Sequence, residues 1–543
     1  MRNSGTVAAV GGFAATVALL TGLSSARADE LSELRTNQEL LQRRIDQLAQ
    51  ANPGAGNPFA ASQNPGSGAA AAGGSFPRSF LIPGTETSIR IGGFVDMTAN
   101  YWLSGGPANA SPQSTTVMTN GQLPGTPLDV HGQFVPGNGA AIAGTGGVGN
   151  VAVQNQHSRG HVFSMSARES RLSIETRTPT AFGESRTYLE FDFAGCNNFS
   201  CASANHVSNN LVPRLRHAYG TLGGLLAGQA NSNFRDADAD SETLDFGGSA
   251  GQSGVTRVPQ VRYTQPIPAF FLGGALSMSI EAPQTDVASS TGLVFSDTNA
   301  SGTPAGPNPA GIAGSVSNNF TKATAPDVTF AYYVPQPWGH VQVSGVVRDL
   351  DIQDGKFLSR EFIGWGLHLS GDVKPRWLGW DRDTITWQVT GGQGIGRYLN
   401  EGSGIALATN AASTGAATVC AAPGQNPINV TAGACSGLGA ASNIIVKPIM
   451  AFGGSVGYQH YWLPNLRSTA VFGIRHQDVP SNLIGPAQSI AVNKELITTH
   501  LNLIWNPVSF VDLGVEYAWG HRTVVANLKG DVNAVIGKMR VRF

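Results

Sequence analysis

Charge is scarce in this sequence, since Asp, Glu, Lys and Arg make up 13% of its 543 residues, against roughly 25% in a typical soluble domain. The net charge is −1, so the chain lacks the basic surface that nucleic-acid binding requires. After residue 28 there is no apolar run of about 18 residues, the length that a transmembrane helix needs. The hydrophobic fraction, 41%, is too high for a chain that is disordered throughout. We therefore expect a folded protein that crosses no membrane by a helix and has no nucleic-acid partner.

Cysteine is also scarce. The four cysteines form two local pairs, Cys196 with Cys201 and Cys420 with Cys435, each in a polar loop rich in small residues. An even number in an exported chain predicts two disulfides. Metal binding is the alternative, but neither pair has C-x-x-C spacing or a nearby histidine cluster, so we expect no metal and no cofactor.

The first 28 residues have the pattern of a secretory signal peptide. Arg2 precedes an apolar stretch of small residues over 6–23, and Ala26-Arg27-Ala28 matches the A-x-A cleavage pattern. A membrane anchor is the alternative, although the apolar stretch ends at the cleavage pattern. The mature chain is predicted to begin at Asp29.

Residues 29–50 carry three heptads of a coiled-coil helix, which we expect in the periplasm. Apolar residues recur at alternating spacings of three and four, and one polar residue interrupts them, which helps to specify register and copy number. The predicted seam is Leu31, Leu34, Gln38, Leu41, Ile45 and Leu48. The alternative is a single amphipathic helix packed on its own domain. Against it, residues 51–77 contain no charge and are mostly Ala, Gly, Asn and Pro, a composition typical of a flexible linker. We place this linker at 51–78 and a β-barrel at 79–543.

Glycine and proline are abundant, with 69 and 30 residues, and from about residue 86 hydrophobicity alternates with period two. Between 188 and 193, for example, Leu189, Phe191 and Phe193 alternate with Glu190 and Asp192. Short turns and long polar loops also alternate along the chain. Sixteen strands are expected at about 88–103, 161–178, 184–194, 213–222, 225–231, 256–264, 271–282, 327–334, 339–349, 361–371, 383–394, 447–462, 465–476, 494–506, 509–520 and 532–543.

This pattern predicts an all-β protein, a 16-stranded antiparallel transmembrane β-barrel with an N-terminal coiled-coil helix. Because a closed barrel satisfies its backbone groups internally, its apolar face can meet lipid while the polar face surrounds water. Sixteen strands leave an aqueous channel, whereas about eight would fill with side chains. The alternating last strand ends at Phe543, a C-terminal aromatic that resembles the signal read by the outer-membrane barrel assembly machinery. We expect a bacterial outer-membrane protein in contact with the lipid bilayer and lipopolysaccharide.

The polar faces of the predicted strands are richer in basic than in acidic residues. These faces carry thirteen basic and eight acidic positions, and this basic excess would concentrate anions in a channel with low-dielectric walls. Alternatively, many arginines pair with acids on neighbouring strands and only stiffen the wall. The tightest predicted cluster is Arg214 and Arg216 with Arg186 and Arg262. The predicted pore-lining basic residues are Arg90, Arg171, Arg177, Arg186, Arg214, Arg216, Arg262, Arg348, Arg467, Arg475, Lys538, Arg540 and Arg542.

The chain resembles the DcaP-like porins. The segments that carry the resemblance are SFLIPGTETSIRIGGFVD at 79–96, SRLSIETRTPT with TYLEFDF at 170–193, RLRHAYGTLGGLLAGQANSNF at 214–234, ETLDFGG at 242–248 and VPQVRYTQPIP at 258–268. The resemblance implies a homotrimeric outer-membrane channel with a periplasmic coiled coil. It also implies passive uptake of small, often negatively charged solutes such as dicarboxylates.

In trimeric porins of this size the third long loop folds inward, so the resemblance assigns a constriction to residues 231–255. The residues expected to line or brace it are Asn233, Arg235, Asp236, Asp238, Asp240 and Glu242. With Asp245 this loop holds five acids, which either oppose anion selectivity or anchor the loop to the arginine wall. A calcium-binding EF-hand is rejected, because Ser241 replaces its glycine and Gly247 stands where its glutamate should be. A looser cation site in this acidic run is the alternative.

One short motif of hydrolases occurs in the sequence, outside its usual structural context. G-x-S-x-G occurs at 247–251 and 453–457, in neither case with the strand–turn–helix context of a nucleophile elbow. We predict a non-enzymatic porin that passes small hydrophilic solutes and favours anionic ones. The alternative is an envelope-tethering or surface-interaction protein that uses the barrel as an anchor.

Overall fold

The computed structural model describes residues 73–105, 161–195, 212–254, 256–268, 272–289, 321–322, 324–353, 359–400, 404–409, 444–480, 493–525, 527 and 529–543. The predicted signal peptide, the coiled coil with its seam residues and the four cysteines lie outside the described residues. They remain predictions.

Sixteen strands, with β3 and β4 counted as one interrupted strand, form a closed antiparallel sheet, which confirms the predicted barrel. Its strands are β2 (Ser88–Ser104), β3 (Val162–Ser166) with β4 (Arg171–Thr180), β5 (Gly183–Asp192), β6 (Arg214–Leu222), β7 (Leu225–Asn231), β8 (Arg257–Pro266), β9 (Ala275–Glu281), β12 (Asp327–Gln336), β13 (Gly339–Gln353), β14 (Ser359–Val373), β15 (Thr384–Gln393), β18 (Met450–Leu463), β19 (Leu466–Asp478), β20 (Asn493–Val508), β21 (Val511–Val524) and β22 (Lys529–Arg542).

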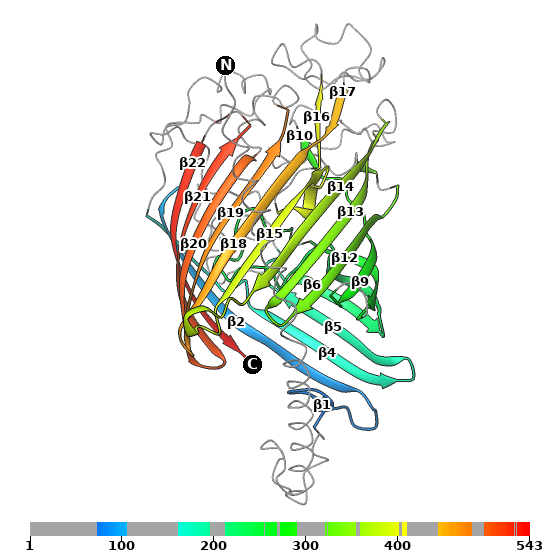
Figure 1. Ribbon diagram of the computed structural model, residues 1–543, viewed down its shortest axis with the longest axis vertical. Helices are drawn as coiled ribbons and strands as arrows, with labels where there is room; N and C mark the ends of the chain where they lie inside the picture. Colours follow the sequence, from blue (N-terminus) through cyan, green and yellow to red (C-terminus); the bar gives the residue numbers. More distant parts are fainter. Residues whose placement is uncertain are drawn as a thin grey trace, which may run out of the picture. The chain divides into compact units, whose positions relative to one another are not determined.

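The sheet closes where β2 pairs with β22, from Phe94 opposite Arg542 to Ser104 opposite Asn533. Strand β2 pairs on its other edge with both β3 and β4 (Figure 1). The single strand predicted at 161–178 is thus interrupted at 167–170. The backbone turns there, with the Ser170 N–H donating to Ala167 O at 3.1 Å.

The two faces of the barrel have opposite polarity. On β2, Val95 and Met97 are 58% and 47% exposed on the outer face, whereas Asp96, Thr98 and Asn100 are buried on the inner face. An outer face of exposed aliphatic side chains is stable only against an apolar solvent, as in membrane barrels, which are apolar outside and polar inside. The amino-acid alternation therefore decides on which face of the wall most of the polar strand residues lie.

One rim of the barrel has the short turns. Residues 181–182, 223–224, 337–338, 464–465 and 509–510 each join neighbouring strands there. The short strand β1 (Phe80–Leu81), which pairs with the start of β2, and the C-terminal Phe543, whose N–H donates to Gly93 O at 3.1 Å, belong to the same rim.

The remaining elements are small. Strands β10 (Val287–Ser289), β16 (Ile405–Thr409) and β17 (Ile444–Pro448) form a separate three-stranded sheet at the end of the barrel remote from the C-terminus (Figure 1). Strand β11 (Thr321–Lys322) extends the barrel wall beside β13. The described residues also include the 3₁₀ turns η3 (Trp377–Gly379) and η4 (Gly396–Tyr398), and no helix among them has the length and hydropathy to span a membrane.

Candidate functional site

The segment between β7 and β8 lies inside the barrel. The Asn233 N–H donates to Glu281 of β9 at 2.9 Å, and Ser241 Oγ lies 2.7 Å from Thr386 Oγ1 of β15. Further along, the Ala250 N–H donates to Thr498 Oγ1 of β20 at 2.9 Å. Because all three wall residues are on the inner face, the loop narrows the lumen from the side of β9 to β20.

Glycines on the wall allow this close approach. A Cβ at Gly473 would overlap the Ala250 carbonyl oxygen, and a Cβ at Gly453 would lie 2.7 Å from Gly251 Cα. Gly251 itself has φ +77°, a conformation that only glycine adopts readily. The backbone of the loop therefore packs directly against the backbone of the wall.

An apolar contact and a carboxylate fix the middle of the loop. Leu244 packs in a buried cluster inside the lumen with Trp102, Ile504, Ala518, Val532, Ala534 and Ile536. The fully buried carboxylate of Glu516 accepts the backbone N–H groups of Leu244 and Asp245 at 2.6 and 3.1 Å, and His500 Nδ1 lies 3.0 Å away.

A second anchor lies near the start of the loop. Asp236 accepts hydrogen bonds from His340 Nε2 at 2.8 Å and from Ser370 Oγ at 2.7 Å. The other ring nitrogen of His340 faces Asp372, and a histidine that donates from both nitrogens is positively charged. Burial would raise the pKa of Asp236, but the hydrogen bonds from His340 and Ser370 outweigh it and hold that pKa below its ordinary value.

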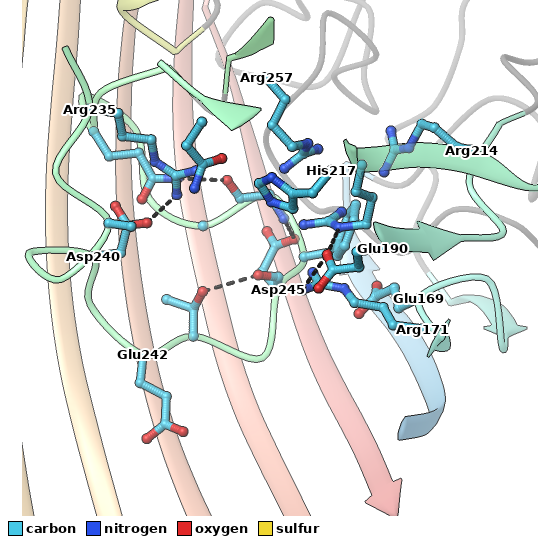
Figure 2. Close-up of a pocket in the computed structure, with 18 of the residues that line it drawn as sticks. Glu169, Arg171, Glu190, Arg214, His217, Arg235, Asp240, Glu242, Asp245 and Arg257 are labelled. Carbon is cyan, nitrogen blue, oxygen red and sulfur yellow. Dashed lines mark hydrogen bonds and ion pairs between the residues drawn. The ribbon is translucent and has the colours of Figure 1, made fainter. Parts of the chain in front are cut away.

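Between the loop and the opposite wall there is a cavity of about 780 Å³. Nine basic and five acidic side chains line it, so its lining is positive overall. Figure 2 shows Arg214, His217 and Arg257 together on one side, with Asp240 and Glu242 on the loop. The cavity therefore has a basic wall, built from β2, β4–β6, β8 and β22, and a more acidic face on the loop.

Two buried carboxylates of the basic wall, Glu175 and Asp192, each pair with more than one arginine. Glu175, 1% exposed, pairs with Arg90, Arg177 and Arg186. Asp192, fully buried, accepts Arg214 at 2.6 Å and Arg216 at 2.7 Å. Two further carboxylates take part, since Glu184 pairs with Arg177, and Glu190 pairs with Arg216 and lies 3.6 Å from Arg171. Each group thus sets three arginines against two carboxylates and keeps a net positive charge.

Seven of the thirteen predicted pore-lining residues line this cavity: Arg90, Arg171, Arg186, Arg214, Arg216, Lys538 and Arg540. From the predicted constriction set, Arg235, Asp240 and Glu242 line it. Asn233 and Asp236 are buried against the wall and brace the loop, whereas Asp238 is exposed. Glu242 forms a bidentate pair with Arg467 at 2.6 and 2.7 Å, so at least one loop acid anchors to a wall arginine.

Two predicted pore-lining arginines are buried instead. Arg348 is fully covered, because the 282–286 and 394–395 segments pack over it and it donates to Gly394 O, Ile395 O and Asp327. Arg475 is also fully buried. Arg467 holds the loop, and Arg262 lies on the inner face but outside the cavity lining. These four residues shape the wall and the loop rather than the lining of this cavity.

His217, Tyr219 and Arg257 are among the cavity residues that the sequence analysis missed. His217 and Tyr219 reach the lumen because a bulge opposite Glu190 and Phe191 shifts the alternation of β6, so that Arg216 and His217 both point inward. By the alternation of β8, Arg257 should point outward like Pro259 and Val261. It is the first residue of the strand, however, and its side chain lines the cavity. Among the described residues Arg257 has no carboxylate partner.

No metal site accompanies the cavity in the part of the chain that the structure describes, where no three His, Cys, Asp or Glu side chains are placed to hold an ion. The rings of Tyr188 and Tyr219 lie 5.7 Å apart, tilted by 41° to one another, beside the Arg186 guanidinium. The basic wall thus presents guanidinium groups alongside aromatic rings, an arrangement suited to planar anions.

Comparison with known families agrees with the resemblance predicted from the sequence. The family model of the DcaP outer membrane proteins matches residues 129–272 and 452–543. Among curated proteins, none matches the chain.

Comparison with solved structures shows the porin fold. The outer membrane channel DcaP of Acinetobacter baumannii superposes with a TM-score of 0.56 at 20% identity, over 86% of this chain and 99% of that one. An anion-selective porin from Comamonas acidovorans superposes with a TM-score of 0.41 at 9% identity, over 84% of this chain and all of that one. OmpT of Vibrio cholerae reaches 0.41 at 8% identity, over 84% of this chain and 98% of that one.

Proposed function

We propose that this DcaP-like barrel is a homotrimeric diffusion channel of the bacterial outer membrane that favours small anionic solutes, dicarboxylates among them. The observation that carries the proposal is the cavity between the inward loop and the basic wall, with nine basic and five acidic lining residues. In a narrow space with low-dielectric walls, such an excess raises the local concentration of anions.

The arrangement of the basic groups supports a preference for carboxylates. Arg257 and the surplus charge of the arginine groups on Glu175 and Asp192 are available to a solute within one cavity. Guanidinium groups bind carboxylates through two parallel hydrogen bonds. A solute with a carboxylate at each end can bind the next arginine group with one carboxylate before the other carboxylate leaves the previous group.

The lengths of the strands support the trimer. A strand that crosses lipid needs about 9–11 residues, whereas β7 and β9 have 7 residues each. Their outward side chains are nonetheless apolar and exposed in the single chain, as for Leu225, Met278 and Ile280. We assign this low wall, β7–β9, to contacts with neighbouring protomers, with the 29–50 helix as a periplasmic clamp on the trimer.

Planar-bilayer recordings of the mature protein test the proposal. Conductance steps in groups of three and a reversal potential that favours chloride over potassium in a KCl gradient are expected. A protein that never conducts, or one that clearly prefers potassium, would refute the channel or its selectivity, respectively.

A further inference from the structure

The turn between β14 and β15, residues 374–383, differs from the other turns of the short-turn rim. It has ten residues and contains Lys374, Arg376, Asp381, Arg382 and Asp383. The six other turns of that rim, 181–182, 223–224, 267–274, 337–338, 464–465 and 509–510, contain no charged residue. Among the turns of this rim, charge is therefore concentrated in one.

This turn folds onto the outer face of the barrel. Asp383 accepts a hydrogen bond from Tyr458 Oη at 2.6 Å, lies 2.8 Å from His460 Nδ1 and accepts the Tyr461 N–H at 3.2 Å. Tyr458 and His460 alternate with the inner residues of β18 and share the outward face of Val456, which is 37% exposed. A rigid polar base thus lies beneath the turn on the side that meets the bilayer.

Three tryptophans cover this polar base, and their side chains are exposed on the surface of the barrel. Trp380 and Trp462 contact the His460 ring edge-on, with centroids 4.6 and 4.4 Å away, and Trp377 approaches Tyr458. The exposed fractions of Trp377, Trp380 and Trp462 are 48%, 44% and 60%. Tryptophan in this position marks the level of the lipid head groups.

The cations of the turn have no anion of their own. Lys374 and Arg376 are exposed, and within the described ranges neither they nor Arg382 has a carboxylate partner. Arg376 donates only to the Pro337 carbonyl at 3.4 Å, and Arg382 lies 4.1 Å from the centre of the Tyr461 ring. Since Asp383 is engaged by His460, three cations face one exposed acid, Asp381.

We propose that the 374–383 turn binds the phosphate head group of an anionic phospholipid in the leaflet on the short-turn side of the membrane. Lys374 and Arg376 contact the phosphate, and Trp377, Trp380 and Trp462 lie against the glycerol and upper acyl region. The tryptophans favour a lipid over a soluble or cell-wall polyanion, which would need only the cations. The inference depends on the membrane location of the barrel and not on what the channel conducts.

Native mass spectrometry of the full mature chain in detergent tests this site. Phosphatidylglycerol and phosphatidylcholine are titrated separately, and the retained lipid is measured for the wild type and for the double variant Lys374→Gln/Arg376→Gln. Each basic residue near a membrane surface contributes about 1 kcal/mol, so the double variant should retain phosphatidylglycerol about ten- to thirtyfold less strongly, with phosphatidylcholine unchanged.

The control is Arg360→Gln, which removes an exposed arginine at the start of β14, at the opposite rim. It should leave phosphatidylglycerol retention unchanged. Because all three substituted side chains are exposed, the variants should keep the electrophoretic heat shift of the folded barrel. On the wild type alone, raising the salt concentration should weaken phosphatidylglycerol retention, since screening acts on exposed charges.

Three results would overturn the proposal. One is equal retention of the two lipids by the wild type, and another is an equal loss in the Arg360→Gln control. The third is a double variant that retains phosphatidylglycerol normally but no longer sediments with purified cell-wall sacculi, which would assign the cations to the wall polymer.

Discussion

Glu516 accepts the backbone N–H of Leu244 at 2.6 Å, and this bond joins the inner wall of β21 to the middle of the constricting loop. The residues are 272 positions apart in the chain. A loop that would otherwise have to satisfy its own backbone groups is held across the lumen by a wall carboxylate. The size of the cavity therefore depends on the wall beneath the loop as well as on the loop sequence.

Replacing Glu516 by alanine should loosen the loop. It leaves the N–H groups of Leu244 and Asp245 buried without an acceptor, at about 1–3 kcal/mol each. We expect higher and noisier single-channel conductance. Glu361→Ala, an exposed acid in β14, is the control, and unchanged conductance in Glu516→Ala would mean that the other contacts suffice.

Arg257→Gln should change selectivity without changing stability. Its guanidinium lines the cavity and has no carboxylate partner among the described residues, so its removal leaves no buried charge. The anion-to-cation permeability ratio from reversal potentials should fall about two- to fivefold, as expected for one partly screened charge. An unchanged ratio would show that ions cross elsewhere.

Arg216→Gln should behave differently. Arg216 is 7% exposed and pairs with Glu190 at 2.6 Å and with the fully buried Asp192 at 2.7 Å. Removing one partner of a buried ion pair lowers the free energy of unfolding by about 3–5 kcal/mol. Because Arg214 still pairs with Asp192 in this variant, we expect a loss at the lower end of that range. The temperature at which the folded band disappears in semi-native electrophoresis should drop, whereas in Arg257→Gln it should stay constant.

Gly473→Ala should displace the loop, because the new methyl group would overlap the Ala250 carbonyl. Gly537→Ala is the matched control, since a Cβ there meets nothing within 4 Å. We expect altered conductance and faster protease cleavage within 231–255 only in the first variant. Identical behaviour of the two would contradict the close packing of loop and wall.

Acid should release the loop only at low pH. The pKa of Asp236 is held below its ordinary value, so its ionised form stabilises the loop anchor at every pH above that value. This contribution is lost as the pH falls through the lowered pKa. His340 and Ser370 contact the Asp236 carboxylate, and Asp372 contacts the other ring nitrogen of His340. Channel noise should therefore stay constant from pH 7 to about pH 4 and rise below it.

The Asp236→Asn variant serves as the comparison for that titration. It cannot ionise, so it should show the noisy state already at neutral pH and no further change on acidification at this anchor. A wild-type transition between pH 5 and 7 would point to another titrating group.

The barrel could be predicted because its periodicity is strict and its turns are short. Strand β7, predicted at 225–231, has those bounds, since Gly223-Gly224 marks its start and the polar loop marks its end. Strand β13 instead runs to Gln353, beyond the predicted 349, because it continues to pair with β14. Pairing with a neighbour, which no local pattern encodes, determines where the long strands stop.

The site was less predictable for two physical reasons. A single bulged residue in β6 reverses the alternation, so His217 and Tyr219 face the lumen against the period-two rule. Arg348 obeys that rule, yet it is buried because segments 46 to 64 positions away in the chain cover it. Alternation gives the side of the wall on which a residue lies, whereas the loops decide whether it reaches water.

Liposome swelling with two solutes of equal length and opposite charge tests the central claim most directly. Butanedioate and 1,4-diaminobutane are compared in liposomes that contain the purified protein. The account predicts that swelling is faster with butanedioate, since the lining of the cavity is positive overall. Equal rates, faster entry of the diamine or no swelling with either solute would contradict it.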